Sequence, residues 1–252
     1  MSDFNRNVTA RGGFADRTAA VDAGLRTYML RVYNYMGAAV ALTGVVAWLC
    51  FQNAVVTNEA GAITGLTSFG QMLLGGYTPI VLMLATLGLV FFISFRIHTL
   101  QYTTALALFM VYAALLGAAL TSIFVAYTGA SVARVFFISA ASFGALSLYG
   151  YTTQRDLSAM GSFLIMGLFG IIIASLVNIF LKSSGLDWAI SVIGVGVFAG
   201  LTAYDTQRIK EMYDSIDDDG TMGRKAVMGA LSLYLDFINL FLMLLRLVGD
   251  RR

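Results

Sequence analysis

Long apolar runs alternate with short polar segments along the chain after residue 27. Each run has about the 20 mostly apolar residues that an α-helix needs to cross a bilayer. The pattern predicts an all-α membrane protein with an N-terminal cytoplasmic tail at residues 1–27, a transmembrane domain at 28–248 and a short C-terminal tail at 249–252. The seven predicted transmembrane helices cover residues 28–51, 79–95, 103–125, 133–151, 159–181, 188–206 and 226–248.

The seventh run differs from the other six because polar residues interrupt it at helical spacing. A single stripe of a helix carries Ser232, Asp236, Asn239 and Arg246, which follow one another in steps of four, three and seven residues. A carboxylate at membrane depth costs roughly 2.5–3.5 kcal/mol or more, so Asp236 should face a protein interior or a wet cavity. We therefore expect the last of the seven helices to be the central one.

The composition fits a membrane protein and excludes several classes of function. Of the 252 residues, 58% are hydrophobic and 12% are charged, about half the charged fraction of a typical soluble domain. The single cysteine, Cys50, excludes an intrachain disulfide and a cysteine-based metal site, and His98 is the single histidine. The net charge of +2 gives no indication of nucleic-acid binding, and no nucleotide motif points to an ATP-driven pump. We expect no cofactor and no enzyme activity.

The distribution of positive charge predicts the orientation in the membrane. With the N-terminus inside, eleven Lys and Arg residues lie in inner segments and five in outer segments. The inner set is Arg6, Arg11, Arg17, Arg26, Arg31, Arg96, Arg155, Arg208, Lys210, Arg224 and Lys225. The outer set is Arg134, Lys182, Arg246, Arg251 and Arg252. The positive-inside rule therefore favours an inner N-terminus and an outer C-terminus, and the polar start of the chain predicts no cleavable signal peptide.

Two acids stand out near membrane depth. Asp236 lies roughly 15 Å into the seventh run at 1.5 Å per residue. The sixth helix is expected to continue past Asp205 to about Met212, which puts Asp205 roughly 10 Å deep. The two helices are antiparallel neighbours, so the carboxylates can face each other and share one proton, as in a pH-sensitive latch. The alternative is two separately hydrogen-bonded aspartates that tie the helices together.

Three other patterns near these acids have competing interpretations. Arg96 ends the second run on the inner side, where it either anchors the helix in the interface or forms an ion pair with an aspartate. The Tyr204–Asp205 pair is similar to that of intramembrane aspartyl proteases, but the second acid lacks the Gly-x-Gly segment of those enzymes. The acidic run at residues 217–219 lacks the spacing of a calcium-binding EF-hand, so it predicts a solvated loop.

The segments AYDTQRI (Ala203–Ile209) and ALSLYLDFINLFLMLLRLV (Ala230–Val248), with seven spans and the Arg96 helix end, resemble the Bax inhibitor family. The resemblance implies a bacterial member with six helices around the last. It also implies a pH-dependent calcium leak governed by Asp205 and Asp236, with Arg96 pairing with the first aspartate. Some bacterial relatives are linked to a membrane-bound protease, and animal relatives to the suppression of cell death.

These observations predict a multi-pass protein of a bacterial cytoplasmic (inner) membrane that passes cations, above all Ca²⁺. Calcium takes six to eight oxygen ligands. Asp205 and Asp236, with Ser232 and Asn239 along the ion path, could offer some of them to a passing ion, and water the rest. Membrane lipid and the calcium ion are the expected partners, without nucleic acid. The alternative is a regulator that conducts nothing and binds a partner such as a membrane protease through residues 1–26.

Overall fold

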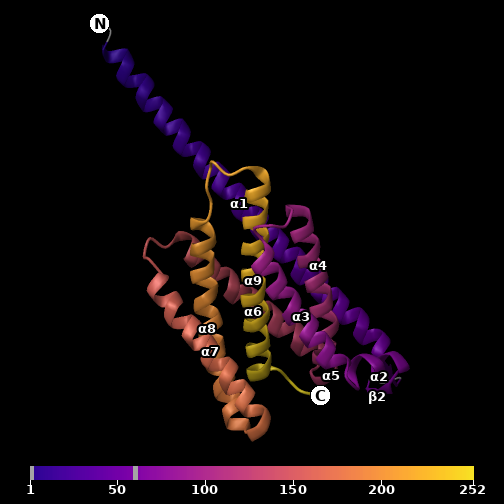
Figure 1. The fold of residues 1–252 in the computed structure, drawn as a ribbon. Coiled ribbons are helices and arrows are strands. Elements are labelled where there is room, and N and C mark those ends of the chain that lie inside the picture. Colours follow the sequence, from indigo (N-terminus) through magenta and orange to yellow (C-terminus); the bar gives the residue numbers. More distant parts are fainter. Residues whose placement is uncertain (1–2, 59–61) are drawn as a thin grey trace.

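The computed structural model describes residues 3–58 and 62–252, and gives no side-chain detail for residues 3–20. Helices dominate this part of the chain, as the apolar runs predicted (Figure 1). The elements are α1 (Asp3–Ala54), β1 (Val55–Thr57), β2 (Ile63–Leu66), α2 (Ser68–Leu74), α3 (Thr78–Arg96), α4 (Tyr102–Ala119), α5 (Thr121–Ala126), α6 (Gly129–Thr152), α7 (Ser158–Leu181), α8 (Ser184–Glu211) and α9 (Asp219–Val248).

Seven helical segments of the described residues are long and apolar enough to cross a membrane, which confirms the predicted fold class. Each predicted run lies within one of them. The third run is divided at Leu120, where ψ of −2° takes the backbone out of the regular α-helix between α4 and α5. The sixth run continues through Glu211 with Met212 as its C-cap, as expected from the sequence.

The last helix is the central one, as the polar stripe predicted. Of its most apolar 18-residue stretch, 67% is buried, the largest share among the seven spans of the described chain. The helices α1, α4, α6 and α8 pack directly on α9, and Figure 1 shows α9 running between α8 on one side and α4 on the other, with α1 crossing it diagonally. The helices α3 and α7 lie further out, where α3 packs on α4 and α7 packs on α8.

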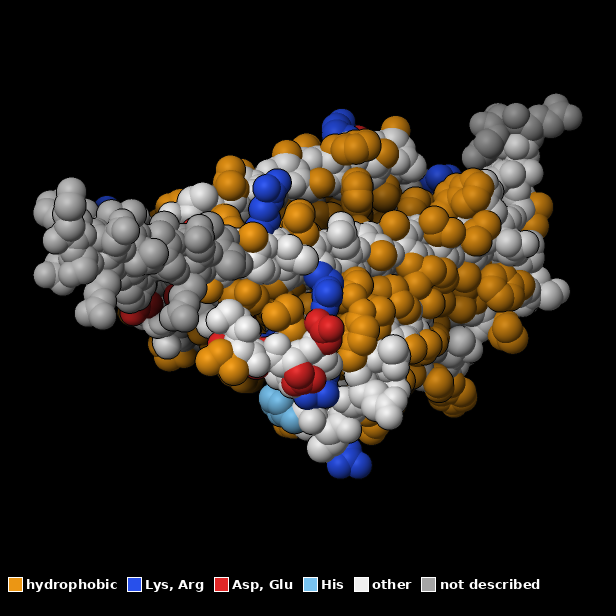
Figure 2. Space-filling model, turned by 90° about the horizontal axis from the view of Figure 1, so that it is seen from above, with side chains coloured by type: hydrophobic (Ala, Val, Ile, Leu, Met, Phe, Trp, Pro, Cys, Tyr) orange, Lys and Arg blue, Asp and Glu red, His pale blue; other side chains and the backbone are white. Residues whose placement is uncertain are grey.

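Both predicted tails have secondary structure or fixed contacts. The N-terminal segment is helical from Asp3 and continuous with the first span, so α1 extends far beyond the bundle (Figure 1). Residues 1–2 of this predicted tail, and the side chains of residues 3–20, lie outside the described part. Seen along the bundle from this end, Lys and Arg side chains lie next to Asp and Glu side chains, with hydrophobic side chains around them (Figure 2).

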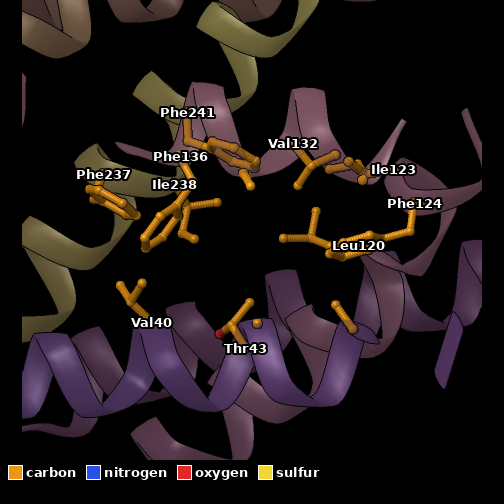
Figure 3. Close-up of a pocket in the computed structure, with 14 residues that line it drawn as sticks. Val40, Thr43, Leu120, Ile123, Phe124, Val132, Phe136, Phe237, Ile238 and Phe241 are labelled. Atoms are coloured by element: carbon orange, nitrogen blue, oxygen red, sulfur yellow. The ribbon is translucent and has the colours of Figure 1, made fainter. Parts of the chain in front are cut away.

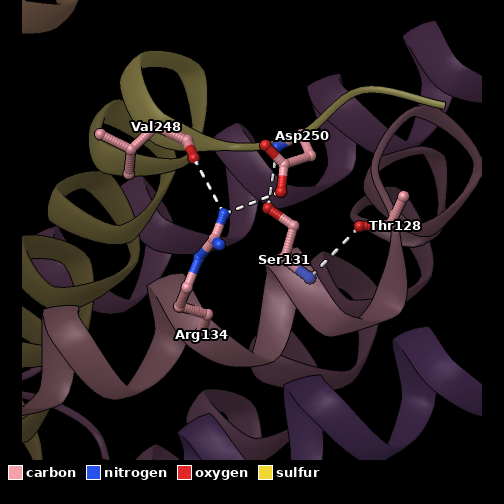
Figure 4. Close-up of polar contacts among 5 residues, drawn as sticks. All are labelled: Thr128, Ser131, Arg134, Val248 and Asp250. Atoms are coloured by element: carbon pink, nitrogen blue, oxygen red, sulfur yellow. Dashed lines mark hydrogen bonds and ion pairs between the residues drawn. The ribbon is translucent and has the colours of Figure 1, made fainter.

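The C-terminal tail is tied to the start of α6 (Figure 4). The backbone N–H of Asp250 donates to Ser131 Oγ at 2.8 Å, and Arg134 Nη2 forms an ion pair with Asp250 Oδ2 at 2.8 Å. The backbone N–H of Arg252 donates to the carbonyl oxygen of Ala126 at 3.0 Å. The tail thus joins the end of the central helix to the α5–α6 connection.

The long polar loop between the first two spans folds as well. The strands β1 and β2 pair antiparallel, and Thr67 Oγ1 caps α2 by accepting from the N–H of Gly70 at 3.0 Å. Pro79 lies in the first turn of α3, where its missing N–H leaves no helical hydrogen bond broken.

Candidate functional site

The packing of α8 against α9 brings the two predicted acids together. Asp205 lies less than two turns before the end of α8, and Asp236 lies in the middle of α9. Their carboxyl groups are within hydrogen-bonding reach of each other. Two ionised carboxylates have no hydrogen to donate, so this contact becomes a hydrogen bond only when one of them carries a proton.

The surroundings of Asp236 make that proton important. Only 6% of the Asp236 surface is exposed, and its Oδ2 atom is buried without a hydrogen-bond partner among the described residues. Asp205 is only partly buried. A buried carboxyl oxygen without a donor is costly, and most of all when it is charged. A proton or a cation at Asp236 therefore lowers the free-energy cost of burying this carboxyl group.

A hydrogen-bonded tyrosine fixes the rotation of α9 two residues before Asp236. The backbone carbonyl oxygens of Ala39 and Ala113 both lie 2.9 Å from Thr43 Oγ1 of α1 and share its hydroxyl hydrogen. The single hydrogen of this hydroxyl is therefore used, so the hydroxyl of Tyr234 must be the donor in the 2.7 Å contact with Thr43 Oγ1. Tyr234 is fully buried, with the ring of Phe109 edge-on at 5.5 Å. This contact holds α9 against α1 and α4.

A second chain of hydroxyl groups begins beside Asp205. Thr206 Oγ1 donates to the carbonyl oxygen of Thr202 at 2.7 Å and lies 2.9 Å from Ser147 Oγ of α6. Ser147 Oγ in turn lies 2.7 Å from the hydroxyl of Tyr33 on α1. The chain connects α8, α6 and α1 at the level of the aspartate pair.

The positive charge that acts on Asp205 comes from Arg208, one turn further along α8. The sequence reasoning missed this residue, although the i, i+3 spacing of Asp205 and Arg208 was readable. Arg96 is exposed in the last turn of α3, and it belongs to none of the ion pairs found between described residues. Arg96 forms no ion pair with Asp205 or Asp236 in this arrangement, and its pairing with an aspartate stays a prediction.

The other members of the stripe have different surroundings. Ser232 and Asn239 are partly buried, and Asn239 Nδ2 donates to the carbonyl oxygen of Leu235 at 2.8 Å. Arg246 forms an ion pair with Asp187 of α8, with Nη1 3.7 Å from Oδ1. The described residues contain no cluster of three or more His, Cys, Asp or Glu that could hold a metal ion.

Beyond Asp236, towards the C-terminal end of α9, the interior is apolar. Phe237 packs edge-on against Phe136 and Phe143 of α6, with ring centres 5.6 Å apart in both pairs. A cavity of about 220 Å³ lies next to these rings, lined by α1, the α4–α5 segment, α6 and α9 (Figure 3). Thr43 is its one hydroxyl-bearing lining residue. The lining of this cavity is therefore almost entirely hydrocarbon.

Comparison with known proteins identifies the family. A family model described as "Inhibitor of apoptosis-promoting Bax1" matches residues 25–252. The "Inner membrane protein YbhL" of Escherichia coli (strain K12) is 49% identical over 232 residues, which cover 91% of this chain and 94% of that protein. The "Uncharacterized protein RP147" of Rickettsia prowazekii is 48% identical over 257 residues, and this alignment covers 100% of both chains.

An uncharacterized protein of Caulobacter vibrioides is 44% identical over 259 residues, again with 100% of both chains covered. The seven apolar helices fit a multi-pass membrane protein, in line with the name of the Escherichia coli relative. The matching family is one of membrane proteins of the Bax inhibitor type and not a known enzyme class. The chain belongs to the Bax inhibitor family.

Proposed function

We propose that the protein is a pH-sensitive leak channel for cations, above all Ca²⁺, in which the pair of Asp205 and Asp236 is the gate. The observation that carries the proposal is the contact of two carboxyl groups at a buried helix–helix interface, where Asp236 Oδ2 has no donor among the described residues. One shared proton gives that interface an O–H···O⁻ hydrogen bond, which is short and strong. Loss of the proton leaves two negative charges that repel each other.

In this proposal the described arrangement is the closed state. With the proton in place, α8 and α9 stay together, and the rings of Phe136, Phe143 and Phe237 fill the interior beyond Asp236. When the proton leaves, repulsion separates the two acids, and Arg208 offers Asp205 an alternative partner. Because Phe237 is the next residue after Asp236, a movement of α9 at the gate also displaces the aromatic block.

The cation is the transported species in this proposal. Calcium prefers six to eight oxygen ligands and accepts irregular geometry. The two aspartates supply charge, Ser232 and Asn239 supply oxygens along the same stripe of α9, and water completes the shell. The orientation expected from the positive-inside rule places the gate nearer the cytoplasmic end.

Calcium flux into liposomes that contain the purified protein tests the proposal. We expect flux to rise with pH in the wild type, and Asp205→Asn and Asp236→Asn each to flatten this dependence. The double variant should add little, because both changes remove one coupled unit. Glu211→Gln is the matched control, since Glu211 is an exposed acid at the end of the same helix. A wild-type pH profile in both single variants would leave the aspartates as structural ties.

The alternative is a non-conducting regulator that binds a partner such as a membrane-bound protease. It is favoured by the helical extension of α1 beyond the bundle, which a channel core does not need (Figure 1). Deleting residues 1–20 distinguishes the two functions. A channel keeps its calcium flux after this deletion, whereas a regulator conducts nothing when intact and loses its partner.

A further inference from the structure

The helices α1 and α6 form the two walls of an open space that we call the lateral crevice. Both helices pack on α9, but in the described part of the chain they make no extensive contact with each other. Two cavities lie between their facing sides. One, of about 600 Å³, lies towards the N-terminal end of α1, and the other, of about 220 Å³, towards its C-terminal end (Figure 3). The larger one falls within the roughly 300–1,000 Å³ typical of small-molecule sites.

Glycines keep the crevice open. Gly44 of α1 and Gly129 and Gly144 of α6 line the cavities, and a Cβ built on any of them meets no heavy atom within 4 Å. Gly150, on the same helix α6, is the opposite case, because its Cβ would collide with the carbonyl oxygen of Ala203 on α8. The glycines of the crevice therefore do not serve close packing of helices. Their effect is to leave space.

Positive charge lies at one end of this otherwise apolar space. Arg26 lines the larger cavity, and it belongs to none of the ion pairs among the described residues. Lys210 Nζ donates to the carbonyl oxygen of Tyr151, another lining residue, at 2.9 Å, and lies 5.4 Å from the centre of its ring. Further in, the paired hydroxyls of Tyr33 and Ser147 line the same cavity.

We propose that the lateral crevice binds an anionic phospholipid. Its phosphate lies between Arg26 and Lys210, and one acyl chain runs along the facing sides of α1 and α6 past Gly144. Both parts of the ligand match the lining, because the charge is at the mouth and the walls beyond it are mostly apolar, with the Tyr33 and Ser147 hydroxyls already paired to each other. A site at the end where the N-terminus lies takes its lipid from the leaflet on that side. This proposal does not depend on ion conduction.

Photo-crosslinking in reconstituted membranes tests the site. Two probes carry a diazirine in the acyl chain, one a phosphatidylglycerol and the other a phosphatidylcholine, and mass spectrometry maps the labelled peptides. We expect phosphatidylglycerol to label the facing sides of α1 and α6 more strongly than the outer face of α7. Arg26→Gln should reduce the preference for phosphatidylglycerol over phosphatidylcholine about fivefold, the effect of one cation near the surface.

A second variant tests the acyl-chain path. A Cβ on Gly144 meets no heavy atom within 4 Å, so Gly144→Leu places a side chain in the crevice and should remove most labelling of α1 and α6. Gly170→Leu is the control, because Gly170 of α7 has equally open surroundings outside the crevice. If Gly144→Leu fails to fold, Gly44→Leu replaces it on the opposite wall. Equal labelling by both probes, or labelling that persists in the filled variants, means that the lipids are ordinary bilayer lipids and overturns the proposal.

Discussion

The helices α7 and α9 show opposite relations between hydrophobicity and burial. Helix α7 contains the most hydrophobic stretch of the seven described spans, yet only 11% of that stretch is buried in the protein. Helix α9 is less hydrophobic and carries Asp236, yet 67% of its corresponding stretch is buried. In a soluble protein the more hydrophobic helix would be the interior one. This relation does not hold in a membrane. Lipid hydrocarbon chains are as apolar as leucine, so no hydrophobic driving force moves the more apolar helix into the protein interior.

Helix α9 is therefore interior because of its polar groups and small residues, and not because of its hydrophobicity. Its tyrosine and aspartate find partners only inside the bundle, and Gly229 lets Ile209 of α8 approach closely. The exposed side chains of α7 include Phe163, Phe169 and Ile173, each more than half exposed in the absence of lipid. Substitutions that change polarity or side-chain size should therefore affect insertion and stability differently on α7 and on α9.

The largest effect is expected when an acid is placed on α7. Phe169 is 61% exposed at the middle of that helix, so Phe169→Asp puts a carboxylate into lipid without a protein partner. We expect a loss of roughly 2.5–3.5 kcal/mol or more in the free energy of membrane insertion. The measurement is the fraction of folded, inserted protein, with Phe169→Leu as the control. Equal yields of the two variants would contradict the assignment of this face to lipid.

The next effect concerns small residues on the two helices. A Cβ on Gly229 of α9 would lie 2.9 Å from Ile209 Cγ2, whereas a Cβ on Gly170 of α7 meets nothing within 4 Å. Gly229→Leu should lower the free energy of unfolding by about 1–3 kcal/mol through overpacking, and Gly170→Leu should leave it nearly unchanged. Unfolding in detergent measures both. Similar losses in the two variants would contradict this difference in packing, because the higher helix propensity of leucine over glycine favours the folded state at both positions.

The sequence predicted most of the fold because lipid imposes a simple pattern on helices. Length and hydropathy located all seven spans, and Pro79 marked the start of α3. The polar stripe through Asp236 identified the central helix, because a carboxylate at that depth needs a protein environment. The antiparallel α8–α9 hairpin then placed Asp205 next to it, since the two helices are consecutive and each acid lies at a similar depth.

Other features depend on contacts that no pattern along the chain reports. The strands Val55–Thr57 and Ile63–Leu66 have only three and four residues, too short for an alternating pattern to be recognised. The crevice exists because α1 and α6 both pack on α9 and approach each other only locally, as at the Tyr33–Ser147 contact. The sequence does not distinguish Gly144, which faces open space, from Gly150, which contacts the backbone of α8. The surroundings of these two glycines depend on how the helices pack in three dimensions.

A smaller loss of stability is expected when the hydrogen bond between Tyr234 of α9 and Thr43 of α1 is removed. Tyr234→Phe removes the hydroxyl that donates to Thr43 Oγ1, while Thr43 keeps its own bonds to backbone carbonyls. We expect a loss of about 1 kcal/mol in the free energy of unfolding. The matched change on α7 is Ser162→Ala, which removes a hydroxyl bonded only to its own helix, to the carbonyl oxygen of Ser158. That variant should unfold like the wild type, and a loss equal to that of Tyr234→Phe would refute the special role of the interior bond.

The smallest effect is expected at the start of α9, outside the apolar spans. Asp218 caps this helix, and hydrogen bonds from Thr221 and Gly220, together with the charge of Arg224, hold the pKa of Asp218 below its ordinary value of 3.8. A lowered pKa in the folded state means that the ionised form stabilises the fold above the unfolded pKa, and that this stability is lost as pH falls through the folded pKa.

Thermal unfolding of the wild type and Asp218→Asn over a pH series measures this contribution. The difference between the two should be constant well above pH 3.8 and should shrink at lower pH, because the wild-type side chain then becomes neutral like asparagine. Helix α7 gives the comparison, since Leu157 provides no side-chain cap and the preceding Asp156 accepts from the N–H of Ser158 at 2.8 Å. The pKa of Asp156 is lowered by the same kind of hydrogen bond. The difference in thermal stability between the wild type and Asp156→Asn should therefore also shrink as the pH falls. A difference that does not change with pH would mean that Asp218 stabilises α9 only through the geometry of its cap.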